Sequence, residues 1–230
     1  MKDNNESVLA QTGGPDVWSV ILGICVTVGL AAAGFLLGIA AGGKAGDTHS
    51  FWYLSRSAGV VAYLLLWGSV VWGMLLSARA RWSFLRPANT LDAHQFLSNV
   101  AIGFAFFHAL VLVGDRYLSL PLSQLLTPFA SGYQPAFVAA GQIALWLSLF
   151  LSLSYLVRHI TGNRAWRLFH FTSYGAYWLA FFHSAVTGGD SRSIPMLGLY
   201  LTTAFIIAML TGYRVWRSES GSKRKVGTGA

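Results

Sequence analysis

The sequence predicts an all-α integral membrane protein, a six-helix transmembrane bundle with both termini in the cytoplasm. Hydrophobic residues make up 54% of the 230 residues and charged residues only 10%, against about 25% charged in ordinary soluble domains. The apolar residues fall in long runs rather than in the short periodic segments that a soluble core requires. The basic residues, in turn, gather on one side of the expected bundle.

Six stretches are long and apolar enough to cross a bilayer, which takes about 20 helical residues. They are Val17–Ala41, Ser57–Leu76, Leu91–Val113, Ala136–Val157, Leu168–Val186 and Pro195–Val215. We therefore expect a cytoplasmic N-terminal tail (1–16), a transmembrane domain (17–215) and a basic cytoplasmic C-terminal tail (216–230).

The distribution of Lys and Arg sets the expected orientation. With six spans, twelve of these residues share the side of the two termini, and four lie on the other side: Lys44, Arg56, Arg116 and Arg192. Cytoplasmic loops are enriched in Lys and Arg, so both termini should be cytoplasmic. The basic segment Ser222–Lys225 lies beside the membrane, where anionic lipid is the simplest partner. We expect no nucleic-acid binding.

Two of the expected spans begin and end near histidines. His94–His108 reads HQFLSNVAIGFAFFH, and His170–His183 reads HFTSYGAYWLAFFH. Polar groups inside a membrane are costly and usually functional. These two spans both run from the cytoplasm outward, so His94 and His170 should lie near the inner face, and His108 and His183 near the outer face. The spacings of fourteen and thirteen residues correspond to rises of about 21 and 19.5 Å, which places the two pairs at matching depths.

Imidazole is a usual axial ligand of haem iron. We interpret His94 with His170, and His108 with His183, as ligands of two b-type haems, one toward each face. The alternatives are hydrogen-bonded packing residues or a proton path. Zinc is disfavoured because the pairs lie some 20 Å apart and each lacks a third and a fourth ligand.

The angular spacing of the second pair predicts a distortion of its helix. At about 100° per residue, fourteen residues fall about 40° short of four full turns and thirteen fall about 140° short. A straight fifth span would therefore not aim both of its histidines the same way. We expect a local kink at Thr172, Ser173 or Gly175.

Three arginines are candidates for contact with haem propionates. Arg167 precedes His170 by three residues and shares its helix face, Arg56 lies at the outer end of the second span, and Arg116 follows His108 by eight residues. Each could equally be an ordinary interfacial arginine. The outer loop is expected to form a short helix over Pro121–Thr127, either a lid over the outer pocket or a docking site for a partner.

Three longer segments carry a resemblance to a known family. They read SRSAGVVAYLLLWGSVVWGMLLSAR, GDRYLSLPLSQLLTPFASGYQP and WRLFHFTSYGAYWLAFFHSAVTGGD. Together with the histidine spacing, they resemble the ferric reductase-like transmembrane domain of NADPH oxidases and ferric-chelate reductases, in particular its bacterial stand-alone members. More distantly, they are similar to the haem-binding membrane subunit of the periplasmic methionine sulfoxide reductase system. The likeness covers most of residues 51–195.

The resemblance implies a function. It makes His94, His108, His170 and His183 the haem ligands, sends electrons outward from the cytoplasmic side, and suggests the bacterial inner membrane as the location. The chain departs from the oxidases because only about fifteen residues follow Val215, with no Gly-rich dinucleotide fingerprint. The donor would then be a separate flavoprotein reductase, a quinol or a partner subunit, and flavin or quinone is a further candidate cofactor.

Two functions follow from this interpretation. The first is a bis-haem cytochrome that relays electrons across the membrane to an outer acceptor. The alternative is a haem-bearing or structural subunit of a larger membrane redox complex, without a substrate of its own.

Overall fold

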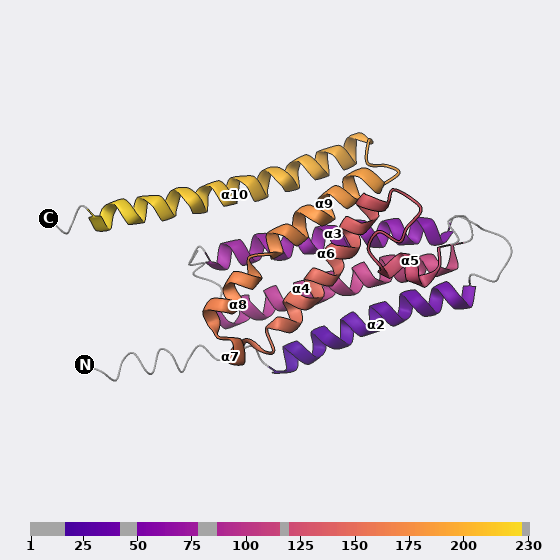
Figure 1. The fold of residues 1–230 in the computed structure, drawn as a ribbon, viewed down its shortest axis with the longest axis horizontal. Coiled ribbons are helices and arrows are strands. Elements are labelled where there is room, and N and C mark those ends of the chain that lie inside the picture. Colours follow the sequence, from indigo (N-terminus) through magenta and orange to yellow (C-terminus); the bar gives the residue numbers. More distant parts are fainter. Residues whose placement is uncertain (1–16, 42–49, 78–86, 116–119, 227–230) are drawn as a thin grey trace.

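The computed structural model describes residues 17–41, 50–77, 87–115 and 120–226, and all the regular structure in these ranges is helical. The long helices run side by side along the longest axis of the molecule (Figure 1). In the described ranges, five helices are long and apolar enough to cross a membrane. The chain is therefore a helical protein suited to a bilayer.

The first half of the bundle consists of α2 (Val17–Ala41), α3 (Ser50–Ser77) and α4 (Pro87–Leu110), and a 3-10 turn (Val111–Gly114) continues α4. Small residues allow α2 and α4 to approach closely, as is common between membrane helices. A Cβ atom on Gly34 would stand 2.9 Å from the backbone of Phe107, and one on Gly103 would stand 3.0 Å from Thr27 Cα. The predicted first span has the bounds of α2.

The second half begins with a short helix, α5 (Leu122–Leu126), after Pro121. It continues with α6 (Pro135–Ser154), which has proline at its start, where the missing N–H costs no hydrogen bond. The small helices α7 (Arg158–Thr161) and α8 (Asn163–His170) follow, separated by Gly162 at a φ of 81°. Next come α9 (Ser173–Thr187) and the long α10 (Ile194–Val226).

A buried cluster of aromatic and aliphatic side chains joins α3, α9 and α10. Its centre is Tyr63, whose hydroxyl lies 2.6 Å from Thr203 Oγ1 and 3.3 Å from the hydroxyl of Tyr177. Tyr177 is fully buried, and Tyr200 donates a hydrogen bond of 3.0 Å to the Ser184 carbonyl. Because each tyrosine hydroxyl has a partner, the cluster satisfies the polar groups that it buries.

One sequence expectation needs correction. The fifth span was expected as one helix over Leu168–Val186, but the chain leaves the helix at Phe171 and Thr172, which divides the segment into α8 and α9. The interruption lies where the histidine spacing predicted a kink. Helix α10 runs from Ile194 to Val226, and its apolar part of membrane length, Ile194–Trp216, ends where the C-terminal tail was expected to begin. The expected N-terminal tail lies outside the described residues.

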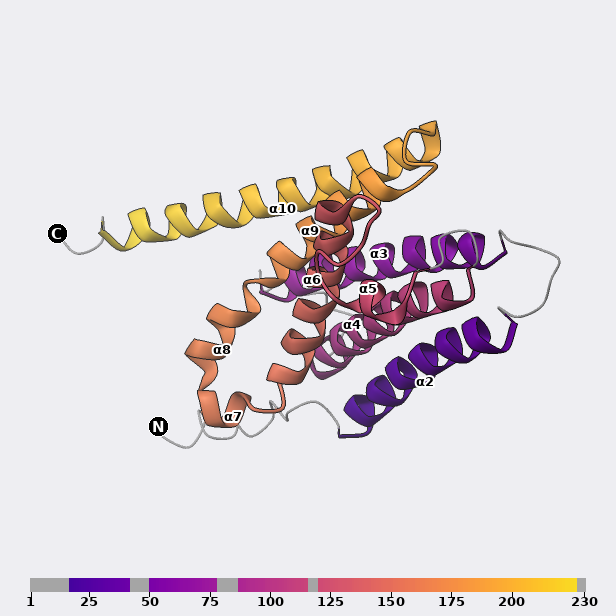
Figure 2. The ribbon, with the colours of Figure 1, turned by 45° about the vertical axis from the view of Figure 1, so that its right-hand side comes forward.

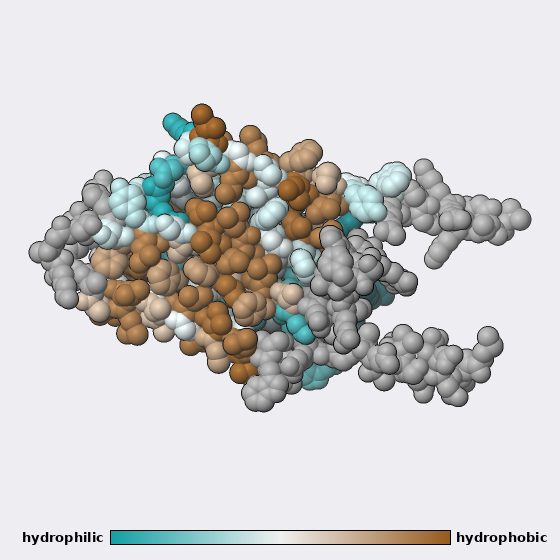
Figure 3. All heavy atoms as spheres, turned by 180° about the vertical axis from the view of Figure 1, so that it is seen from behind, coloured by the Kyte–Doolittle hydropathy of each residue, from teal (hydrophilic) through white to brown (hydrophobic). Residues whose placement is uncertain are grey.

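The outer surface of the bundle is largely apolar. Side chains such as Leu36, Leu201 and Phe205 are 62%, 70% and 67% exposed. Seen from behind, apolar residues cover the middle of the molecule, and hydrophilic ones gather toward its edge (Figure 3). Such a surface suits contact with lipid rather than with water.

Candidate functional site

The structure brings the four histidines together as two pairs. The ring centres of His94 and His170 lie 6.1 Å apart with their planes at 75°, and those of His108 and His183 lie 6.1 Å apart at 77°. These are the partners that the matching depths predicted. A transition metal bonded to two facing imidazole nitrogens, at about 2 Å each, would hold the ring centres roughly 6 Å apart.

Helix α3 holds the two histidines of α4 through backbone carbonyls. The Ser55 carbonyl accepts a hydrogen bond of 2.7 Å from His108 Nδ1, and the Ser69 carbonyl accepts one of 3.1 Å from His94 Nδ1. A carbonyl oxygen only accepts, so Nδ1 must carry the ring proton in both histidines. Nε2 is then left with the lone pair that a metal requires.

A glycine one helical turn after each carbonyl makes room for the ring. A Cβ on Gly59 would stand 2.9 Å from His108 Nδ1, and one on Gly73 would stand 3.1 Å from His94 Cε1. In a helix, the carbonyl of one residue points toward the residue four positions later, so a side chain there would block access to it. Ser55–Gly59 and Ser69–Gly73 thus form two equal cradles, fourteen residues apart.

Helix α6 supplies a third cradle. The Phe137 carbonyl accepts a hydrogen bond of 2.9 Å from His183 Nδ1. Four residues later, a Cβ on Gly141 would stand 2.6 Å from both Cγ and Nδ1 of His183. Three of the four imidazoles are therefore held in the same tautomer, each by a backbone carbonyl with a glycine four residues later.

The fourth imidazole, His170, is held differently. Its ring stacks on Trp166, with ring centres 4.8 Å apart and planes at 22°. Its Nδ1 is buried and has no hydrogen-bond partner among the described residues. The inner pair thus combines one carbonyl-held ring and one stacked ring.

One cavity of about 930 Å³ contains both pairs, and its lining includes all four histidines. Its volume lies at the upper end of the range of about 300–1,000 Å³ for ligand and cofactor sites. The lining is mostly apolar, which suits a flat apolar macrocycle. Within the described ranges, no three His, Cys, Asp or Glu side chains gather as metal ligands, so a metal held between two of these histidines would need four further ligands beyond those that the described residues bring together. A porphyrin supplies four.

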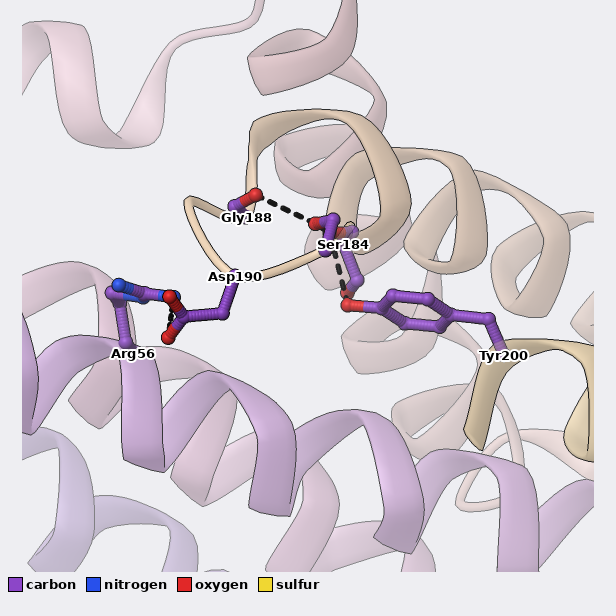
Figure 4. A network of polar contacts seen from close by, with 6 residues as sticks. Arg56, Ser184, Gly188, Asp190 and Tyr200 are labelled. Carbon is purple, nitrogen blue, oxygen red and sulfur yellow. Dashed lines mark hydrogen bonds and ion pairs between the residues drawn. The ribbon is translucent and has the colours of Figure 1, made fainter. Parts of the chain in front are cut away.

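Cations line this cavity at both ends. Arg56 lies on the turn of α3 beside Ser55, covers the Trp52 ring at 4.3 Å, and forms an ion pair with Asp190 from the turn after α9. Figure 4 shows the two side chains facing each other. At the end nearer His170, the cavity is lined by Arg167 and Arg214. Arg116 lies outside the described residues.

The short helix α5 covers part of the cavity. Gln142 of α6 donates a hydrogen bond of 2.7 Å to the Gln124 carbonyl, and Trp146 donates one of 2.8 Å to the Leu126 carbonyl. Leu125 is 7% exposed and lines the cavity. The predicted helix over Pro121–Thr127 is therefore present and lies over the space that holds the outer pair.

No protein-family model, curated protein or solved structure matches this chain in the comparisons with known proteins. The resemblance of the three quoted segments to the ferric reductase-like domain therefore rests on the residues alone.

The sequence interpretation missed the supports of the histidines. Ser55, Ser69, Gly59 and Gly73 form two Ser-x3-Gly motifs at the same fourteen-residue spacing as His94 and His108. That shared spacing was available in the sequence. Arg214 was counted only as a topology residue, yet it lines the cavity and donates a hydrogen bond of 2.7 Å to the Tyr174 hydroxyl.

Proposed function

We propose that this chain is a bis-haem, b-type transmembrane cytochrome of the ferric reductase-like kind, which relays electrons from the cytoplasmic side or the quinol pool to an outer acceptor. The observation that carries the proposal is the equal geometry of the two pairs. Both place imidazole rings 6.1 Å apart at nearly perpendicular planes. Packing or a proton path would require no such equality.

The proposal assigns a role to each part of the cavity. His94 and His170 would hold the inner haem, and His108 and His183 the outer one. Each haem would supply a one-electron ferric–ferrous couple. The cradles of α3 and α6 keep Nδ1 protonated and Nε2 free, which fixes the ring orientation and raises the basicity of the ligand.

The cationic residues support the placement of the propionates. Arg167 and Arg214 line the cavity near the inner pair, and Arg56 lines it near the outer pair. Arginine suits carboxylates because its planar guanidinium donates two parallel hydrogen bonds. Arg56 already has a carboxylate partner in Asp190, which would share it with a propionate.

The membrane topology is part of the proposal. Six spans, both termini in the cytoplasm and a location in the bacterial inner membrane follow from the basic residues and from the family resemblance. In this topology α8 and α9 together make the fifth span. The ends of α8 and α10 lie at the same end of the molecule as the start of α2 (Figures 1 and 2), as a cytoplasmic face requires.

The first test is a count of haem in the purified chain. A pyridine haemochrome assay should give two haems b per chain, with a low-spin bis-imidazole spectrum. One haem or none would overturn the proposal. The His94→Ala/His108→Ala double variant should be colourless at an unchanged expression level, since each pair would have lost a ligand.

The second test separates the relay from the alternative of a subunit without its own substrate. The chemically reduced protein is mixed with ferric chelate, flavin, quinone or oxygen, and reoxidation is followed in the Soret band. Fast reoxidation by one of them supports the relay. Slow reoxidation by all four, with partners that co-purify, favours the subunit.

A further inference from the structure

The two pairs differ in how firmly their rings are held. In the outer pair, both histidines donate Nδ1–H to backbone carbonyls, at 2.7 and 2.9 Å. In the inner pair, only His94 does so, at 3.1 Å, and the buried Nδ1 of His170 has no partner among the described residues. Buried polar atoms in proteins are nearly always paired, so the exception at His170 calls for an explanation.

The backbone that carries His170 is also unlike the others. His94 and His108 lie inside α4, and His183 lies inside α9, whereas His170 is the last residue of α8. The helix is interrupted immediately afterwards, at Phe171 and Thr172. At its other end, α8 begins after Gly162, whose φ of 81° few other residues adopt. His170 therefore lies on an eight-residue helix with a break at each end.

Helix α8 is weakly anchored to the rest of the bundle. No residue of α8 is buried, and α7 and α8 lie at the end of the bundle (Figure 2). The ring that stacks on His170 is Trp166, which belongs to α8 itself and moves with it. Trp166 is tied to α6 by one hydrogen bond, 3.2 Å from Nε1 to Ser154 Oγ. Its ring also meets the Tyr155 ring edge to face, with ring centres 5.9 Å apart, and lies 5.5 Å from the Arg158 guanidinium.

We propose that His170 is an exchangeable axial ligand, so that the inner haem iron accepts a small neutral ligand of the carbon monoxide class while the outer iron stays closed. This inference rests on the proposed function. With haem bound, the small ligand would take the place of His170 at the ferrous iron, and the His170 Nε2 lone pair would be released with no change of oxidation state. At the outer pair, the same exchange would also have to break the hydrogen bond that holds either ring.

The size of the difference follows from the missing hydrogen bond. Losing the hydrogen-bond partner of a metal-ligating histidine typically weakens metal binding by 10- to 100-fold. His170 lacks that partner from the start. We therefore expect carbon monoxide to bind the inner iron at least about tenfold more tightly than the outer iron.

The experiment uses the full-length, two-haem protein in detergent, reduced with dithionite and titrated with carbon monoxide. The Soret difference spectrum should saturate at one ligand per two haems. Trp166→Leu removes both the stack and the tie to Ser154 and should raise the affinity further. Trp166→Phe keeps a stacked ring, and its affinity for carbon monoxide should lie between those of Trp166→Leu and the parent. Trp216→Leu, at a side chain 65% exposed, is the matched control and should behave like the parent.

The responding haem is assigned with single-ligand variants. His108→Ala should keep the inner haem and still bind carbon monoxide, whereas His94→Ala should keep the outer haem and not bind it. Equal binding at both haems, binding only in His94→Ala, or no binding at any concentration would overturn the inference but leave the haem proposal standing. A colourless parent protein would overturn the haem proposal itself. If either alanine variant fails to retain haem, the Trp166 series in the two-haem protein decides.

Discussion

The cradle glycines give the sharpest prediction, because the structure fixes how much room an added methyl group has. In Gly141→Ala, the new Cβ would stand 2.6 Å from His183 Cγ and Nδ1. The ring must move by roughly 0.8 Å to reach ordinary contact at 3.4 Å. That displacement stretches the 2.9 Å hydrogen bond to the Phe137 carbonyl beyond useful range. The outer haem should then dissociate roughly 10- to 100-fold more readily.

A matched series tests this reasoning. Gly141→Ala, Gly59→Ala and Gly73→Ala place the new Cβ at 2.6, 2.9 and 3.1 Å from a histidine ring, and Gly68→Ala places it at 3.5 Å from Leu97. Gly68 lies on α3 between the two cradles, so its variant controls for the cost or gain of alanine in that helix. Haem loss to excess apomyoglobin, followed optically, should be fastest in the first variant and slowest in the last.

Two results would refute the reasoning. Haem loss that is the same in Gly68→Ala as in the cradle variants would show that the glycines serve only helix packing. Loss of the inner haem in Gly141→Ala, with the outer one retained, would show that the pairs are wrongly assigned to the two sites.

Three further predictions follow from the same geometry. His108→Ala should remove the outer haem and spare the inner one, which pyridine haemochrome and circular dichroism would show as one haem in a folded protein. In a potentiometric titration, the inner haem should be reduced first. The hydrogen bonds from the outer histidines to backbone carbonyls are shorter, at 2.7 and 2.9 Å against 3.1 Å for His94, and a stronger hydrogen bond of this kind makes the imidazole more basic and stabilises ferric iron. Reduction of the outer haem first would contradict this. Asp190→Asn should lower the free energy of unfolding by at most about 1 kcal/mol, since the Asp190 side chain is 69% exposed. Thermal melting should show a small shift at an unchanged haem content.

Much of the helical architecture was predictable because apolar runs of membrane length carry a strong pattern. The first span matched α2, and the second, third, fourth and sixth were found as helices of membrane length, although α3 begins earlier, at Ser50, and α10 runs on to Val226. The fifth span is divided into α8 and α9 and is not among the membrane-length helices of the described ranges. The length of α10 escaped prediction because polar residues, which a span excludes, are still compatible with a helix in water. The interruption at Phe171 was predicted only indirectly, from the angle between His170 and His183.

The pairing of the histidines was predictable, whereas of their supports the sequence shows only the fourteen-residue spacing of the two Ser-x3-Gly motifs. Depth follows from helical rise and topology, so His94 with His170 and His108 with His183 needed no knowledge of packing. The cradles depend on which face of α3 meets α4. A serine carbonyl leaves no trace in the side-chain pattern, and Phe137 contributes only its backbone. Glycines at positions 59, 73 and 141 read as ordinary small residues of membrane helices until the neighbouring ring is seen.

The equal fourteen-residue intervals on α3 and α4 have a consequence for the tolerance of the chain to change in length. Inserting one residue between Gly59 and Ser69 would turn one cradle by about 100° relative to the other, so only one pair could stay aligned. The separation of the two histidine pairs is set by the rise of the α-helix, about 1.5 Å per residue, rather than by lipid thickness. If the two pairs hold haems as proposed, electron transfer between them should therefore proceed at the same rate in thin and in thick bilayers.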